Sequence, residues 1–81
     1  MTEELTLDRI CVGCKAEVVR LRTHGSMRRR LLDIGLTEGA VVECLGRSPS
    51  GDPSAYLIRG AVIAIRAEDC RGIIVRLLEG G

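Results

Sequence analysis

Residues 25–45 read GSMRRRLLDIGLTEGAVVECL and contain a helical pattern, a turn and a strand pattern in direct succession. Three apolar side chains recur at the spacing of one helix face, namely Met27, Leu31 and Ile34. Ser26 is a favourable N-cap and Gly35 fits the position just after a helix, so the sequence predicts a helix from Ser26 to Ile34. A helix of about nine residues is unstable alone. We therefore expect it to pack on a sheet through its apolar face.

The chain on either side of this stretch has the alternation of short strands. The segments with strand character are residues 5–7, 15–22, 40–45, 55–59, 61–66 and 73–77, the last with Ile73, Val75 and Leu77 on its inner face. The alternation of Ala16 and Val18 slips to Leu21, which predicts a bulge in the second strand. Residues 48–53 hold both prolines and predict a loop, and residues 67–70 predict one helical turn.

These elements, in a chain of 81 residues, predict a single domain over residues 1–81. Its expected class is all-β with minor α content. We expect a small, partly open barrel of five to six strands with one short helix inserted after the second strand. The core must be aliphatic, because the chain has one Tyr and neither Phe nor Trp.

Composition argues against several functions. The 12 basic and 11 acidic residues nearly cancel, whereas a general nucleic-acid binder carries a basic excess. One aromatic residue cannot line a groove for proline-rich peptides or stack several bases. With a single histidine, His24, no nucleophile–histidine–carboxylate set stands out, so we do not expect an enzyme. We expect a binding protein that contacts no nucleic acid.

The expected location is the cytoplasm. The first residues, MTEE, are acidic where a secretory signal would be basic and then apolar. The longest apolar run, residues 61–65, is far short of the roughly 20 residues of a membrane helix. We therefore expect the four cysteines to be reduced thiols.

Cys11 and Cys14 have the C-x-x-C spacing of a metal or redox pair. A structural zinc site needs a second such pair, but Cys44 and Cys70 stand alone in the sequence. Cys44 falls on the inner face of its strand and reads as a small core residue. Cys11 and Cys14 are therefore weak metal candidates only, and plain thiols are the favoured interpretation.

The run Arg28-Arg29-Arg30 lies in the first turn of the predicted helix, where positive charge opposes the helix dipole at a cost of about 0.3–1 kcal/mol. Two explanations remain open. The guanidinium groups either reach Glu17, Asp33 or Glu43 within the chain, or they bind carboxylates of a partner.

Residues 29–39, RRLLDIGLTEG, resemble the signature of the FeoA family, small cytosolic proteins that accompany the bacterial ferrous-iron transporter FeoB. The second half of the chain is similar as well, in residues 49–53, 58–60, 63–66 and 73–75. The resemblance runs roughly from Leu5 to Leu77. Two features depart from the pattern: Glu38 replaces a usual proline, and the family shows no requirement for the cysteine pair.

The resemblance implies an SH3-like barrel and an accessory or regulatory role in ferrous-iron uptake. The expected partner is a FeoB-type GTPase transporter, with the membrane reached only through it and self-association left open. The candidate partner-binding residues are Arg28, Arg29, Arg30 and Asp33. No cofactor is expected beyond weak binding of ferrous iron or zinc. The alternative is a free-standing, metal-responsive regulatory domain similar to the C-terminal module of iron-dependent repressors.

Overall fold

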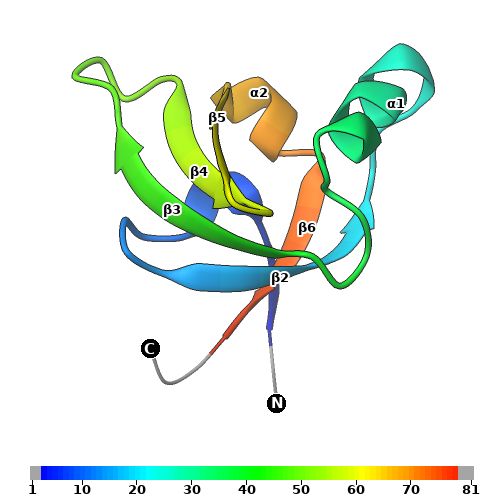
Figure 1. Ribbon diagram of the computed structural model, residues 1–81, viewed down its shortest axis with the longest axis horizontal. Helices are drawn as coiled ribbons and strands as arrows, with labels where there is room; N and C mark the ends of the chain where they lie inside the picture. The colour runs from blue at the N-terminus through cyan, green and yellow to red at the C-terminus, as the bar shows by residue number, and fades with distance from the viewer. Residues whose placement is uncertain (1–2, 79–81) are drawn as a thin grey trace.

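The computed structural model describes residues 3–78, which form six strands around an aliphatic core (Figure 1). The elements in chain order are β1 (Glu4–Thr6), the 3-10 turn η1 (Leu7–Arg9), β2 (Lys15–Leu21), α1 (Gly25–Asp33), β3 (Val41–Arg47), β4 (Ser54–Ile58), β5 (Ala61–Ile65), α2 (Ala67–Cys70) and β6 (Ile73–Leu77). Within the described residues, neither helix has the length and apolar character needed to cross a membrane.

One antiparallel sheet contains all six strands, in the order β1-β6-β2-β3-β4-β5. The sheet curls, and both helices lie on the same side of it (Figure 1). β1 and β5 are its two edges. The expected small, partly open, mainly β fold with a short helix after the second strand is confirmed. So is the bulge in β2, where the pairing with β6 shifts between Val18 and Arg20.

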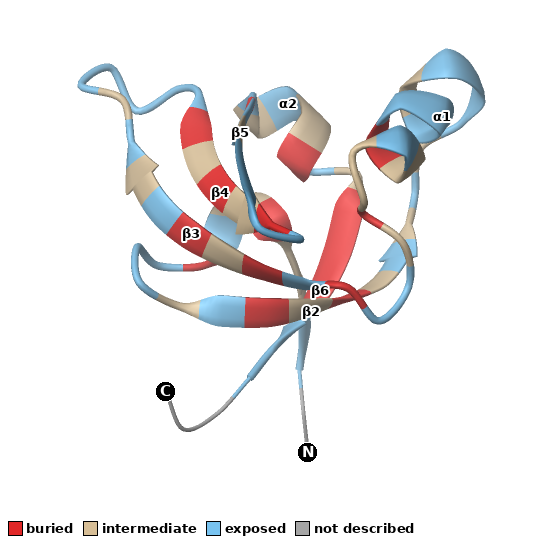
Figure 2. Ribbon diagram, viewed as in Figure 1, coloured by how far each residue is buried: buried red, intermediate tan, exposed pale blue. Residues whose placement is uncertain are grey.

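The core lies inside the curl, and buried residues alternate with more exposed ones along β2, β3 and β4 (Figure 2). The buried residues are mainly aliphatic. The completely buried residues include Leu7, Ala16, Leu36, Val42, Cys44, Tyr56, Ile58, Ile73 and Val75. Leu31 of α1 is also buried, and Met27 and Ile34 pack against the core more peripherally. The predicted apolar face of the helix is therefore confirmed, and Cys44 is the core residue that its position in the strand predicts.

The start of α1 differs from the prediction. The helix begins at Gly25 with His24 in the N-cap position, and no side chain caps it. Gly25 has a φ of +62°, a conformation that glycine reaches without strain, so the chain turns into the helix one residue before Ser26. Ser26 is therefore not the N-cap.

The end of α1 is fixed by a Schellman turn. The Leu36 N–H donates to the Leu31 carbonyl and the Gly35 N–H donates to the Leu32 carbonyl, both at 3.0 Å. Gly35 has a φ of +104°, as predicted for the position after the helix. Leu36 then enters the core completely, so the turn anchors the helix to the barrel.

The inner face of β6 also departs from the prediction. Leu77 is 40% exposed, whereas Ile74 is buried between its two neighbours in register, Thr6 on β1 and Arg20 on β2. Leu77 pairs with β2 only, beyond the last pair between β6 and β1, so nothing from β1 covers it. Alternation along one strand does not reveal how far its neighbours extend.

Two polar groups meet inside the core. The Cys70 thiol donates to the Tyr56 hydroxyl at 3.5 Å, and both residues are almost completely inaccessible to solvent. Burial raises the pKa of the Cys70 thiol from its usual 9.0 to about 11. Burial also raises the pKa of Tyr56 above its usual 10.0, assisted by the hydrogen bond to Cys70. Both groups are therefore neutral in the folded protein at physiological pH.

We predict that Leu31→Ala lowers the free energy of unfolding by about 2–4 kcal/mol, because it leaves a cavity between α1 and the sheet. Urea unfolding measures this directly. Leu45→Ala is the matched control, since Leu45 is 40% exposed and should cost far less. A loss below about 0.5 kcal/mol for Leu31→Ala would contradict the packing of the helix.

We also predict that stability falls as the pH rises from about 9 to about 11. Cys70 ionises near 9.0 when unfolded but near 11 when folded, so its contribution is complete below the first value and lost through the second. Tyr56 acts in the same direction at higher pH. Melting temperatures across this range should decline less steeply in Cys70→Ala than in the parent chain. Cys11→Ala, which removes an exposed thiol, should retain the parent slope.

Candidate functional site

The three predicted arginines of α1 are all exposed. Arg30 approaches the chain's own acid Asp69, with Nη2 and Oδ2 3.9 Å apart, but the Arg30 side chain is 72% exposed, so this pair contributes little. The Arg28 Nη1 donates a long hydrogen bond of 3.5 Å to the Leu21 carbonyl. Arg29 makes no hydrogen bond or ion pair with any residue in the part of the chain that the structure describes. The helix therefore presents largely uncompensated positive charge.

None of the three acidic residues expected as possible internal partners forms an ion pair with these arginines. Glu17 pairs with Arg76 across β2 and β6 instead. Asp33 and Glu43 form no ion pair with any residue from 3 to 78. Asp33 lies exposed in the last turn of α1, so it shares the helix with the arginines but is not joined to them by a contact.

A hollow of about 190 Å³ lies between α1 and β2. Its lining residues are Arg20, Leu21, Arg28, Leu32, Leu36 and Glu38. Leucine side chains supply apolar surface, Arg28 and Arg20 supply positive charge, and Glu38 supplies negative charge. Arg20 is paired with Glu4, so Arg28 is the arginine of the hollow that is free of an acidic partner among residues 3–78. A carboxylate-bearing side chain of a partner fits this chemistry, because guanidinium groups bind carboxylates through paired hydrogen bonds.

Arg20 was not anticipated from the sequence. It sits on β2 at the register shift and its Nη1 lies 2.8 Å from Glu4 Oε1, which holds the side chain at the sheet surface. In the sequence, Arg20 follows two strand residues and belongs to no run of charged residues, so nothing there marks it as a site residue. Only the fold brings it beside Arg28.

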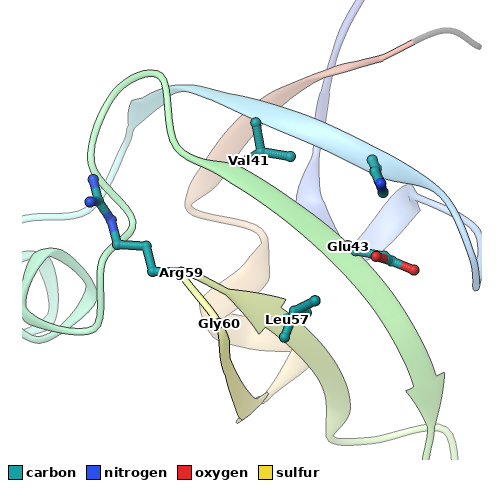
Figure 3. A pocket seen from close by; sticks show the side chains of 6 residues that line it. Val41, Glu43, Leu57, Arg59 and Gly60 are labelled. Atoms are coloured by element: carbon teal, nitrogen blue, oxygen red, sulfur yellow. The ribbon is translucent and has the colours of Figure 1, made fainter. Parts of the chain in front are cut away.

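A second hollow, of about 210 Å³, lies on the outer face of the sheet (Figure 3). Its lining residues are Lys15, Val41, Glu43, Leu57, Arg59 and Gly60. Arg59 extends from the β4–β5 turn toward α1, where its Nη2 donates to Thr37 Oγ1 at 2.9 Å and its Nε donates to the Gly35 carbonyl at 3.4 Å. Arg59 thus joins the end of the helix to the β4–β5 hairpin.

The predicted cysteine pair forms a tight turn. The Cys14 N–H donates to the Cys11 carbonyl at 3.0 Å, and Gly13 between them has a φ of +90°. Cys11 is exposed and Cys14 is half-buried, while Cys44 and Cys70 are buried. Across residues 3–78, no three His, Cys, Asp or Glu side chains are grouped so that they could hold a metal ion. The structure adds no third ligand to the cysteine pair.

Comparisons with known proteins identify the relatives of this chain. The chain is 30% identical over 75 residues to a Porphyromonas gingivalis protein described as a fusion of Fe(2+) transport protein A and Fe(2+) transporter FeoB. The match covers 93% of this chain but 9% of the fusion protein. The solution structure of the FeoA protein from Chlorobium tepidum is 34% identical, with a TM-score of 0.87 over 95% of this chain and 73% of that one.

Two more distant structures share the fold. A zinc complex of FeoA from Stenotrophomonas maltophilia, described as an SH3 domain protein, is 21% identical, with a TM-score of 0.79 over 88% of each chain. A manganese-dependent transcriptional repressor is 19% identical, with a TM-score of 0.84 over 96% of this chain and 44% of the repressor. Both likenesses concern the fold alone.

The profile of the FeoA domain matches residues 5–77, nearly all of the described chain. This match agrees with the resemblance inferred from residues 29–39 and with the SH3-like barrel it implied. The chain therefore belongs to the FeoA family.

Proposed function

We propose that this protein is an accessory subunit of bacterial ferrous-iron uptake that docks on the cytosolic part of a FeoB-type transporter. The observation that carries the proposal is the Porphyromonas gingivalis relative, in which a segment similar to this chain is fused to FeoB. Fusion holds two modules at high effective concentration, which is useful where the modules work on each other. A binding role, rather than catalysis, also suits a site made of arginines and leucines.

The docking surface in this proposal is the arginine face of α1 with the hollow beside it. Arg28 belongs to both the helix face and the hollow, and Arg20 of β2 also lines the hollow. Arg29 is exposed and has no hydrogen-bond or ion-pair partner among residues 3–78. Because α1 begins at Gly25, only Arg28 of the three arginines lies in its first turn, where positive charge opposes the helix dipole and costs stability; Arg30 lies in the last turn. Carboxylates on the partner would offset that cost and would also give the interface its orientation.

A second candidate function is a metal-responsive regulatory domain: the Cys11–Cys14 turn offers two metal ligands, and a manganese-dependent repressor contains a domain of the same fold. Among residues 3–78, the cysteine turn is the best candidate to bind metal, but it supplies two ligands where zinc takes four. The accessory role is preferred because the fusion relative is also the closer match in sequence.

We predict that Arg28→Glu with Arg29→Glu weakens binding to the transporter about tenfold, or about 1.4 kcal/mol. The fold should survive, because both side chains are exposed on α1 and neither belongs to the core. Binding and melting temperature should be measured on the same variant, and the affinity of the parent chain should fall with added salt. Arg9→Glu with Arg71→Glu is the matched control, since both residues are exposed and neither lines the hollow. Equal affinities for the two double variants would contradict this docking surface.

We also predict that the protein purified without added metal contains no stoichiometric zinc or iron, because the cysteine turn lacks further ligands in the described chain. Elemental analysis of the purified protein measures the content. Finding one zinc per chain, lost in Cys11→Ser with Cys14→Ser, would contradict the prediction and favour the metal-responsive alternative.

A further inference from the structure

Strand β5 is an edge of the sheet and pairs with β4 only. Its residues, AVIAI, include no charged or polar side chain. Natural proteins usually protect such an edge with charges, proline, a bulge or a covering element, because its free backbone groups can pair with another chain. β5 is short, with five residues, but it has no charge, proline or bulge, so its edge is open to pairing with another strand.

The register identifies the backbone groups that are free. Ile58 and Ala61 pair across the two-residue turn of Arg59 and Gly60, and a pair in that position exchanges hydrogen bonds. The next pair along the strands exchanges none, so the N–H and C=O of Val62 point away from β4, and those of Ala64 do likewise. Outside the ladder, no backbone or side-chain group in residues 3–78 bonds to them.

Beside this edge, the outer face of the sheet carries an apolar strip. Val62 is 66% exposed and lies opposite Leu57 on β4. Leu57 in turn lines the outer hollow together with Val41 (Figure 3). A strand added to β5 would place its own outward side chains beside Val62. Backbone pairing and apolar contact are therefore available at the same place.

Charge indicates what kind of segment fits. Residues 59–66, RGAVIAIR, carry an arginine at each end and no acidic residue. Arg66 makes no ion pair within residues 3–78, and Arg59 hydrogen-bonds only neutral groups. An incoming strand with apolar residues in its middle and carboxylates toward its ends would match both the strip and the two arginines.

We propose that β5 accepts an extended segment of this kind as a seventh strand of the sheet. The inference rests on the proposed function, because it takes the segment to belong to the transporter. The Arg59 contacts with Gly35 and Thr37 join this edge to the end of α1, so both contacts can belong to one interface.

A second copy of this chain is the less suitable occupant. Antiparallel pairing of two β5 strands centred on Ile63 would bring Arg66 of each copy beside the Arg59–Gly60 turn of the other. Like charges opposite one another in a sheet are destabilising.

The test combines hydrogen exchange with two matched variants, using the full chain and the complete transporter in nanodiscs. Exchange at the Val62 and Ala64 amides is compared with and without the transporter, and we expect at least tenfold slowing in the complex. Val62→Lys puts a charge on the edge and should weaken binding at least tenfold. Val12→Lys makes the same change at a residue of similar exposure outside β5 and should bind within twofold of the parent. Melting temperatures check that both variants fold.

The outcomes separate the two proposals. If the transporter does not bind the unmodified chain, the proposed function and this inference both fail. If it binds while the Val62 and Ala64 amides exchange as in the free chain, or if Val62→Lys binds like Val12→Lys, the inference alone is overturned. Slowed exchange in the chain alone at rising concentration, with dimers in sedimentation, would assign the edge to a second copy and also overturn it.

Discussion

The contact of Arg59 with Gly35 connects the end of α1 to the β4–β5 hairpin. A Cβ atom at position 35 would lie 2.9 Å from the Arg59 Cδ, so the absence of a side chain there lets Arg59 lie over the turn. The positive φ of Gly35 ends α1, and the turn carries Leu36 directly into the core. Because Arg59 also forms the β4–β5 turn, this close approach links the end of α1 directly to the hairpin that contains β5.

The contact matters because α1 inserts little of its surface into the core. The core is built from aliphatic side chains around one buried tyrosine, and only Leu31 of α1 is fully inserted. A helix of nine residues held by one deep side chain would be poorly oriented without a fixed end. The Schellman hydrogen bonds and Arg59 supply that fixed end, so the arginines of α1 are presented on a surface of defined shape.

Much of the fold could be predicted, because its signals are local. The spacing of Met27, Leu31 and Ile34, the glycine after the helix and the slip in β2 each express a constraint read from a few neighbouring residues. Gly25 was missed as the start of α1 because Ser26 is the better capping residue, and only the backbone shows the earlier turn. The site was less accessible to sequence reasoning. The arginines of α1 form a visible run, but Arg20 joins them through strand order, and β5 is seen to be an edge only once the sheet is assembled.

The two candidate contact surfaces differ in chemistry: α1 offers charged side chains, and β5 offers backbone hydrogen-bonding groups. They are therefore suited to different steps of one association. Charges on α1 act at a distance of about a Debye length, so they mainly accelerate and orient the encounter. Backbone groups on β5 act only at hydrogen-bond distance, so they mainly slow dissociation once a segment is aligned. Neither surface needs to be strong. A weak electrostatic contact and a short added strand, joined through Arg59, can together give a docking that is specific and reversible.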